Sequence, residues 1–148
     1  MRWNLKVDKM NQFPGTYELI EKYSIKTDGT KIHPWGVDVK GMIIYTDTHV
    51  SAQLGVRERA NLSTFNFRDA NANETQTAFT TYIAYFGAYE VKNGYVIHDV
   101  QQSLFPNWIG HKVKRYYRFE GDLLYLEAKE IAQTTGLEKT VLVWRRLS

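Results

Sequence analysis

Residues 82–105, YIAYFGAYEVKNGYVIHDVQQSLF, contain the clearest structural signal in the chain. Asn93-Gly94 separates two runs that are rich in tyrosine, valine and isoleucine. A two-residue type I′ turn needs positive φ at both central residues, and Asn-Gly is the pair that adopts this conformation most readily. The pattern therefore predicts a β-hairpin formed by Tyr82–Lys92 and Tyr95–Phe105.

Six further β-rich runs occur along the chain, and turn residues such as Asp28-Gly29 and Glu120-Gly121 separate them. They are Thr16–Ile25, Gly41–Thr46, Val50–Leu54, Lys112–Phe119, Leu123–Ala128 and a last run through Val141, Val143 and Trp144. About eight strands in sequential hairpins predict an all-β protein, and closing the sheet removes its exposed edges. We expect residues 1–148 to form a single domain, an antiparallel up-and-down barrel of about eight strands.

One segment, from Asp69 to Thr81, breaks this rhythm. It begins with capping residues and has apolar residues at helical spacing. We predict a short helix over Asn73–Thr80 near the mouth of the barrel, with Phe79 and Tyr82 turned inward.

Composition excludes several classes of function. The net charge is only +3 and the basic residues are scattered, which argues against nucleic-acid binding. The chain has no cysteine, so disulfides and thiolate chemistry are excluded. Its four histidines show no spacing typical of metal ligands, and no phosphate-binding glycine loop or serine nucleophile motif is present. We expect no metal and no cofactor.

The location of the protein follows from similar observations. The N-terminal residues MRWNLKVDKMNQF contain no continuous apolar stretch typical of a signal peptide, and no window is long enough to span a bilayer. We expect a cytoplasmic protein without membrane insertion. The oligomeric state is open.

Alternation along the strands places polar groups on the apolar, inward face. In Tyr95–Phe105 this face carries His98 and Gln102 among aliphatic residues, and in Lys112–Phe119 it carries Arg115. Because a buried unpaired arginine is costly, Arg115 needs a partner such as Gln102, a tyrosine or a ligand carboxylate.

These faces define a predicted binding site for a ligand. Its members are His98, Gln102, Arg115, Tyr45, Gln53 and one of Tyr85 or Tyr89. Trp108 belongs to a loop and either caps the mouth, where it would touch a ligand, or anchors the turn. Asp99 lies on the opposite face from His98, and Gly87 in mid-strand indicates a bulge or bend.

Several motifs together resemble the lipocalin-like domain proteins of bacteria and fungi. PGTYEL (14–19) is similar to the opening motif of lipocalin barrels, with Tyr17 where tryptophan is usual, and LVWRRLS (142–148) resembles their last strand. KGMIIYTDTHVSAQL (40–54) and residues 81–126 fit the same family in order and spacing. The resemblance implies a barrel whose interior holds a small apolar molecule. It also implies that Arg145 or Arg146 packs on Tyr17, and alternation favours Arg146. It implies no catalytic residues.

We expect the protein to bind a small, largely apolar ligand with an acidic or carbonyl group, oriented by Arg115, His98 and tyrosine hydroxyls. Two alternatives remain open. The first is a cofactor-independent isomerase, cyclase or dehydratase, with His98 as acid–base and Arg115 as electrostatic stabiliser. The second is a barrel filled by its own side chains that acts only through its surface.

Overall fold

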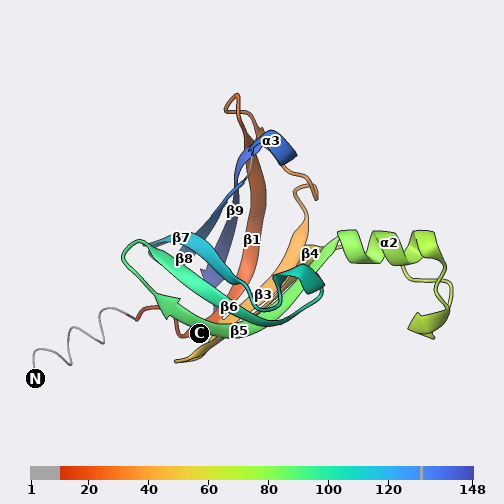
Figure 1. Ribbon diagram of the computed structural model, residues 1–148, viewed down its shortest axis with the longest axis horizontal. Helices are drawn as coiled ribbons and strands as arrows, with labels where there is room; N and C mark the ends of the chain where they lie inside the picture. Colours follow the sequence, from red (N-terminus) through yellow and green to blue (C-terminus); the bar gives the residue numbers. More distant parts are fainter. Residues whose placement is uncertain (1–10, 131) are drawn as a thin grey trace, which may run out of the picture.

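The computed structural model describes residues 11–130 and 132–148, and eight of its strands form a closed antiparallel barrel (Figure 1). The barrel strands are β1 (Gly15–Lys26), β3 (Val39–Tyr45), β4 (His49–Val56), β5 (Tyr82–Val91), β6 (Tyr95–Ser103), β7 (Lys112–Glu120), β8 (Leu123–Lys129) and β9 (Leu137–Arg146). Each pairs with the next, and β9 closes the barrel on β1 through pairs that run from Tyr17↔Arg146 to Lys26↔Leu137. The predicted fold is confirmed.

The remaining elements are short. β2 (Lys31–Ile32) pairs with the far end of β1, and the helices are η1 (Phe67–Asp69), α2 (Ala72–Thr80), η2 (Pro106–Trp108) and α3 (Ala132–Thr135). The longest of them in the described part of the chain, α2, has nine residues, so no helix there could cross a bilayer.

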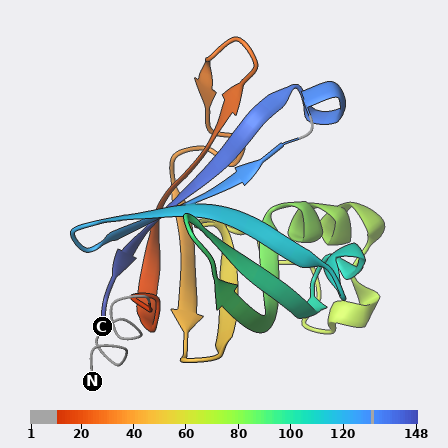
Figure 2. The same ribbon diagram turned by 60° about the vertical axis from the view of Figure 1, so that its left-hand side comes forward.

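The two ends of the barrel differ. The start of β1, the end of β9 and the β3–β4, β5–β6 and β7–β8 hairpins lie at one end, which we call the closed end (Figure 2). The connections that contain α2, η2 and α3 lie at the other end, which we call the mouth. At the β5–β6 hairpin only Gly94 has positive φ (87°), so Asn93-Gly94 does not form the expected type I′ turn although the hairpin itself is present.

Phe13 fills the closed end. Its side chain is 1% exposed, and its ring centroid lies 4.9 Å from those of Tyr45 and Tyr117 and 5.2 Å from that of Phe119. Edge-on aromatic contacts of this kind add to the burial of apolar area. The segment before β1 therefore belongs to the core.

Arg146 covers the neighbouring part of this end. Its guanidinium carbon lies 4.7 Å from the centroid of the Tyr17 ring, and its two terminal nitrogens donate to the carbonyls of Pro14 and Gln12 at 2.8 and 2.6 Å. The expectation that Arg146 packs on Tyr17 is confirmed, and tyrosine serves as the cation–π partner in place of tryptophan.

The helix α2 begins one residue earlier than predicted, because Asn71 caps it and exchanges hydrogen bonds with Glu74. The expectation that Phe79 and Tyr82 turn inward is wrong. The helix extends away from the barrel (Figure 1), so none of its residues is buried and Phe79 is 41% exposed. Tyr82 donates its hydroxyl to Gln53 at 2.8 Å instead.

Candidate ligand-binding site

His98 is the centre of a buried polar cluster in the barrel. Its side chain is fully buried, and both ring nitrogens have a tyrosine partner. Nε2 lies 2.7 Å from the hydroxyl of Tyr45 and Nδ1 lies 2.7 Å from that of Tyr85. The three residues come from β6, β3 and β5, so the cluster forms only when the barrel is assembled.

All three groups are neutral near pH 7. Burial and the positive charge of Arg115 lower the pKa of His98 to about 3. Burial raises the pKa of Tyr45 and of Tyr85, and Arg115 opposes this rise in both. Desolvation disfavours the charged form of each group, which explains all three directions.

Neutrality leaves one hydrogen of the cluster without an acceptor. The two hydroxyls and the imidazole carry three polar hydrogens, but only two hydrogen bonds join them. A neutral imidazole donates from one nitrogen and accepts at the other, so one tyrosine donates to His98 and the other accepts from it. The accepting tyrosine keeps a hydroxyl hydrogen that has no acceptor among residues 11–130 and 132–148.

Trp144 adds a second donor of this kind. Its indole Nε1 is buried in the barrel and has no hydrogen-bond partner in the described part of the chain. An unsatisfied buried donor costs about 1–3 kcal/mol. The barrel interior therefore holds two hydrogen-bond donors that have no acceptor in the described part of the chain.

Arg115 is the positively charged residue that acts on this cluster. It lies on the inward face of β7, opposite Val96, and its side chain is half-buried. Its guanidinium donates to the carbonyl of Lys114 at 3.0 Å, and no carboxylate pairs with it within the described residues. A backbone carbonyl thus takes the place of the partners expected for Arg115, which were Gln102, a tyrosine or a ligand carboxylate.

An apolar pocket of about 290 Å³ opens at the mouth beside the cluster. We call it the mouth pocket; its large lining side chains are Trp35, Phe79, Tyr82, Ile83, Leu104, Phe105 and Trp108. Trp108 packs edge-on against Tyr85, with ring centroids 5.7 Å apart, and against Phe105 at 5.6 Å. The wall of the pocket therefore touches a tyrosine that bonds His98. Trp108 anchors the η2 turn and also lines the pocket.

Tyr89 lies on the inward face as well, but nearer the closed end. Its ring centroid is 4.9 Å from that of Tyr45, and its hydroxyl donates to the carbonyl of Thr46 at 2.6 Å. Both candidate tyrosines of β5 thus face inward. Tyr89 pairs with His98 across the strands, and Tyr85 is the one whose hydroxyl forms a hydrogen bond with His98.

Two predicted members of the site lie outside the barrel. Gln102 is exposed because β6 contains a bulge: Phe86 pairs with Gln102 and Gly87 with Val100, which leaves Gln101 without a partner and reverses the alternation. The predicted bulge at Gly87 is confirmed. Gln53 is exposed because the aliphatic residues beside it in β4, Val50, Ala52 and Leu54, fill the inner face.

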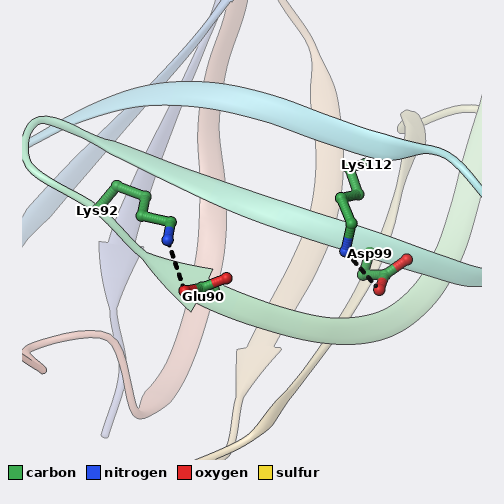
Figure 3. A network of polar contacts seen from close by, with 4 residues as sticks. All are labelled: Glu90, Lys92, Asp99 and Lys112. Atoms are coloured by element: carbon green, nitrogen blue, oxygen red, sulfur yellow. Dashed lines mark hydrogen bonds and ion pairs between the residues drawn. The ribbon is translucent and has the colours of Figure 1, made fainter.

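Asp99 also lies outside, as expected. Its carboxylate pairs with Lys112 at 3.0 Å on the outer surface, near a second pair between Glu90 and Lys92 at 2.6 Å (Figure 3). Asp99 is therefore no partner of His98.

Sequence reasoning missed Lys22 and Trp35. The pairing of β1 with β9 shifts between Leu19 and Glu21, and beyond this bulge Lys22 pairs with Leu142 and faces the interior. Trp35 lies in the loop between β2 and β3 and donates its indole N–H to the carbonyl of Thr80 at 3.3 Å. In the sequence, a large aromatic residue in the loop HPWG was the feature that could have pointed to Trp35 as a lining residue.

Comparison with known proteins agrees with this architecture. Residues 14–147 match the lipocalin-like domain family, so the chain belongs to that family. It is also 32% identical over 90 residues to the 4'-hydroxy-3'-methoxypropiophenone carrier protein ppsC of Aspergillus oryzae, an alignment that covers 55% of this chain and 81% of that protein. No solved structure shows a significant match. Family and relative together support small-molecule binding as the general class of function.

Proposed function

We propose that the protein binds a compact, largely apolar molecule in the mouth pocket, and that a carbonyl or acidic oxygen of this molecule accepts a hydrogen bond from Tyr85. The observation that carries the proposal is the hydrogen count of the Tyr45–His98–Tyr85 cluster, which has three polar hydrogens but only two hydrogen bonds, so one hydrogen is left without an acceptor.

Tyr85 is the better placed of the two tyrosines to offer this donor. Its ring touches Trp108 in the wall of the pocket and it is 9% exposed, whereas Tyr45 is 2% exposed and lies against Phe13. In the arrangement that we propose, Tyr45 donates to Nε2 of His98 and Nδ1–H of His98 donates to Tyr85. The hydroxyl of Tyr85 then donates to the ligand.

The pocket and the charge nearby suit such a ligand. A volume of about 290 Å³ with tryptophan and phenylalanine walls fits one small ring system. The Arg115 guanidinium favours electron-rich oxygen over a basic group. The relative is named as the carrier of an aromatic ketone, which has this combination of ring and oxygen acceptor.

The arrangement favours binding over acid–base catalysis. A histidine whose pKa is about 3 is a weak base near neutral pH, and a general base works best when its pKa lies near the working pH. His98 is better understood as the group that orients Tyr85.

The test uses 3',4'-dimethoxypropiophenone and its analogue without the ketone oxygen, 1,2-dimethoxy-4-propylbenzene, in isothermal titration calorimetry. Neither compound can ionise, so the comparison isolates the ketone oxygen. We expect the wild-type protein to bind the ketone about tenfold more tightly, the worth of one buried hydrogen bond. Tyr85→Phe should bind both compounds equally.

Tyr89→Phe is the matched control, because it removes another inward tyrosine hydroxyl of β5, which donates to the carbonyl of Thr46, and leaves the Tyr45–His98–Tyr85 cluster intact. It should retain the preference for the ketone. Absence of saturable binding, or a preference for the ketone that survives in Tyr85→Phe, would contradict the proposal.

A further inference from the structure

Lys22 is a lysine that points into the barrel beside the mouth pocket. It pairs with Leu142 on the inner face of β9 because of the bulge at Ile20. Its ammonium lies 4.4 Å from the centroid of the Trp35 ring, and Trp35 lines the pocket. Trp35 is held in turn by its hydrogen bond to Thr80, so the ammonium lies against a positioned wall of the pocket.

No carboxylate forms an ion pair with Lys22 anywhere in residues 11–130 and 132–148. Glu130 is the acidic group that influences it, but one Glu130 oxygen accepts from the hydroxyl of Thr140 at 3.0 Å. That hydroxyl also lies 2.8 Å from the hydroxyl of Ser24, which is 1% exposed. The inner wall formed by β1 and β9 thus has its own polar groups, on strands that carry none of the His98 cluster.

Partial burial has a cost for this ammonium. Desolvation lowers the pKa of Lys22, and the charge of Glu130 opposes the shift only as the smaller effect. The face of the Trp35 indole ring attracts the Lys22 ammonium, but it does not use the three N–H donors of that ammonium as a hydrogen-bond acceptor would. An anionic oxygen placed against Lys22 would supply both the missing charge and the missing acceptor.

We propose that Lys22 binds an ionised acidic oxygen of the ligand, a phenolate or a carboxylate, while the apolar body of the ligand packs against Trp35. The inference rests on the proposed function and adds a second polar contact to it. Tyr85 recognises a neutral acceptor such as a ketone, and Lys22 selects molecules that also carry an acidic group. The ligand class becomes a small aromatic or aliphatic body with two oxygen functions, one of them ionisable.

The experiment compares 4'-hydroxy-3'-methoxypropiophenone with its methyl ether, 3',4'-dimethoxypropiophenone, which keeps the ketone but cannot ionise. The wild-type protein should bind the phenol at least about tenfold more tightly than the ether, the range of a charge-assisted contact. Lys22→Met keeps most of the side-chain length and should abolish this preference while it leaves the affinity for the ether unchanged. Lys26→Met, at an exposed position of the same strand, should behave as wild type.

A second readout is the ultraviolet absorption of the bound phenol, because a phenolate absorbs at longer wavelength than the neutral phenol. Binding to the wild-type protein should produce the phenolate band at a pH at which the free compound is neutral, and binding to Lys22→Met should not. A merely structural role for Lys22 would not move this band.

The possible failures are distinguishable. If Lys22→Met weakens the phenol and the ether equally, or if the phenolate band persists in the variant, the inference is overturned and the proposed function stands. If neither ketone binds to the wild-type protein, the proposed function falls and the inference falls with it.

Discussion

The hydroxyl of Tyr85 lies 2.7 Å from Nδ1 of the fully buried His98, and the ring of Tyr85 packs against Trp108 in the wall of the mouth pocket. In the proposed arrangement Nδ1–H donates in this bond, while Nε2 accepts from Tyr45, and only an uncharged imidazole can do both. The protonation state of His98 therefore affects the stability of the whole cluster.

Stability should fall as the pH is lowered below the ordinary pKa of histidine. The pKa of His98 is about 3 in the folded protein and about 6.5 when the chain is unfolded, so between these values the unfolded chain binds more protons. The free energy of unfolding should then decrease by up to about 1.4 kcal/mol for each pH unit between pH 6.5 and 3.

Urea denaturation at pH 7.5 and pH 5 measures this effect. His98→Gln should lose less stability than the wild-type protein between the two pH values, because glutamine does not titrate. His111→Gln, at an exposed position, should lose as much as the wild type. An unchanged pH dependence in His98→Gln would show that another group is responsible.

Phe13→Ala should destabilise the protein by about 3–5 kcal/mol, because the change empties the closed end and removes contacts with four rings. Phe65→Ala is the control, since Phe65 is fully exposed and its removal should change the free energy of unfolding by less than about 0.5 kcal/mol. Equal midpoints of urea denaturation for the two variants would mean that the segment before β1 is not part of the core.

Arg146→Met should destabilise the protein by about 2 kcal/mol, because it removes the cation over Tyr17 and the donors to Pro14 and Gln12. Arg145→Met removes an exposed ion pair with Glu18 and should cost less than about 1 kcal/mol. Thermal denaturation of the two variants side by side makes the comparison. A larger loss in Arg145→Met would be the opposite of what the structure implies.

Gly87→Ala should destabilise the protein by about 3 kcal/mol or more, because a Cβ at this position would lie 1.9 Å from the carbonyl oxygen of Asp99. The bulge at Gln101 brings the two strands this close. Ala88→Ser, at the next residue, should be tolerated. A Gly87→Ala variant with wild-type stability, measured by chemical denaturation, would mean that the bulge can move.

Local chemistry explains why much of the fold was predictable. Asn93-Gly94 and Glu120-Gly121 indicate hairpins without reference to the rest of the chain, and Asn71 with Glu74 caps α2 in the same local way. The inward face of β7, with Arg115 on it, followed from strict alternation because β7 contains no bulge.

Alternation failed at Gln102 for a physical reason. A single unpaired residue in β6 reverses the face of every side chain beyond it, and no residue type in Tyr95–Phe105 shows where that residue lies. The bulge at Ile20 likewise places Lys22 inside the barrel. The prediction for Gln53 failed for a different reason. Its polar side chain was assigned to a cavity, although the aliphatic residues that alternate with it in β4 occupy the inner face.

The sequence by itself determined the order of the strands, the single closed barrel and the burial of His98, because turn propensity and apolar alternation act over a few residues. Only the tertiary structure decided that Tyr45 and Tyr85 hold His98 from two sides, and that Lys22 and Trp35 meet at the mouth. These contacts join residues 13 to 53 positions apart, and their geometry depends on register, bulges and closure, which no local pattern specifies.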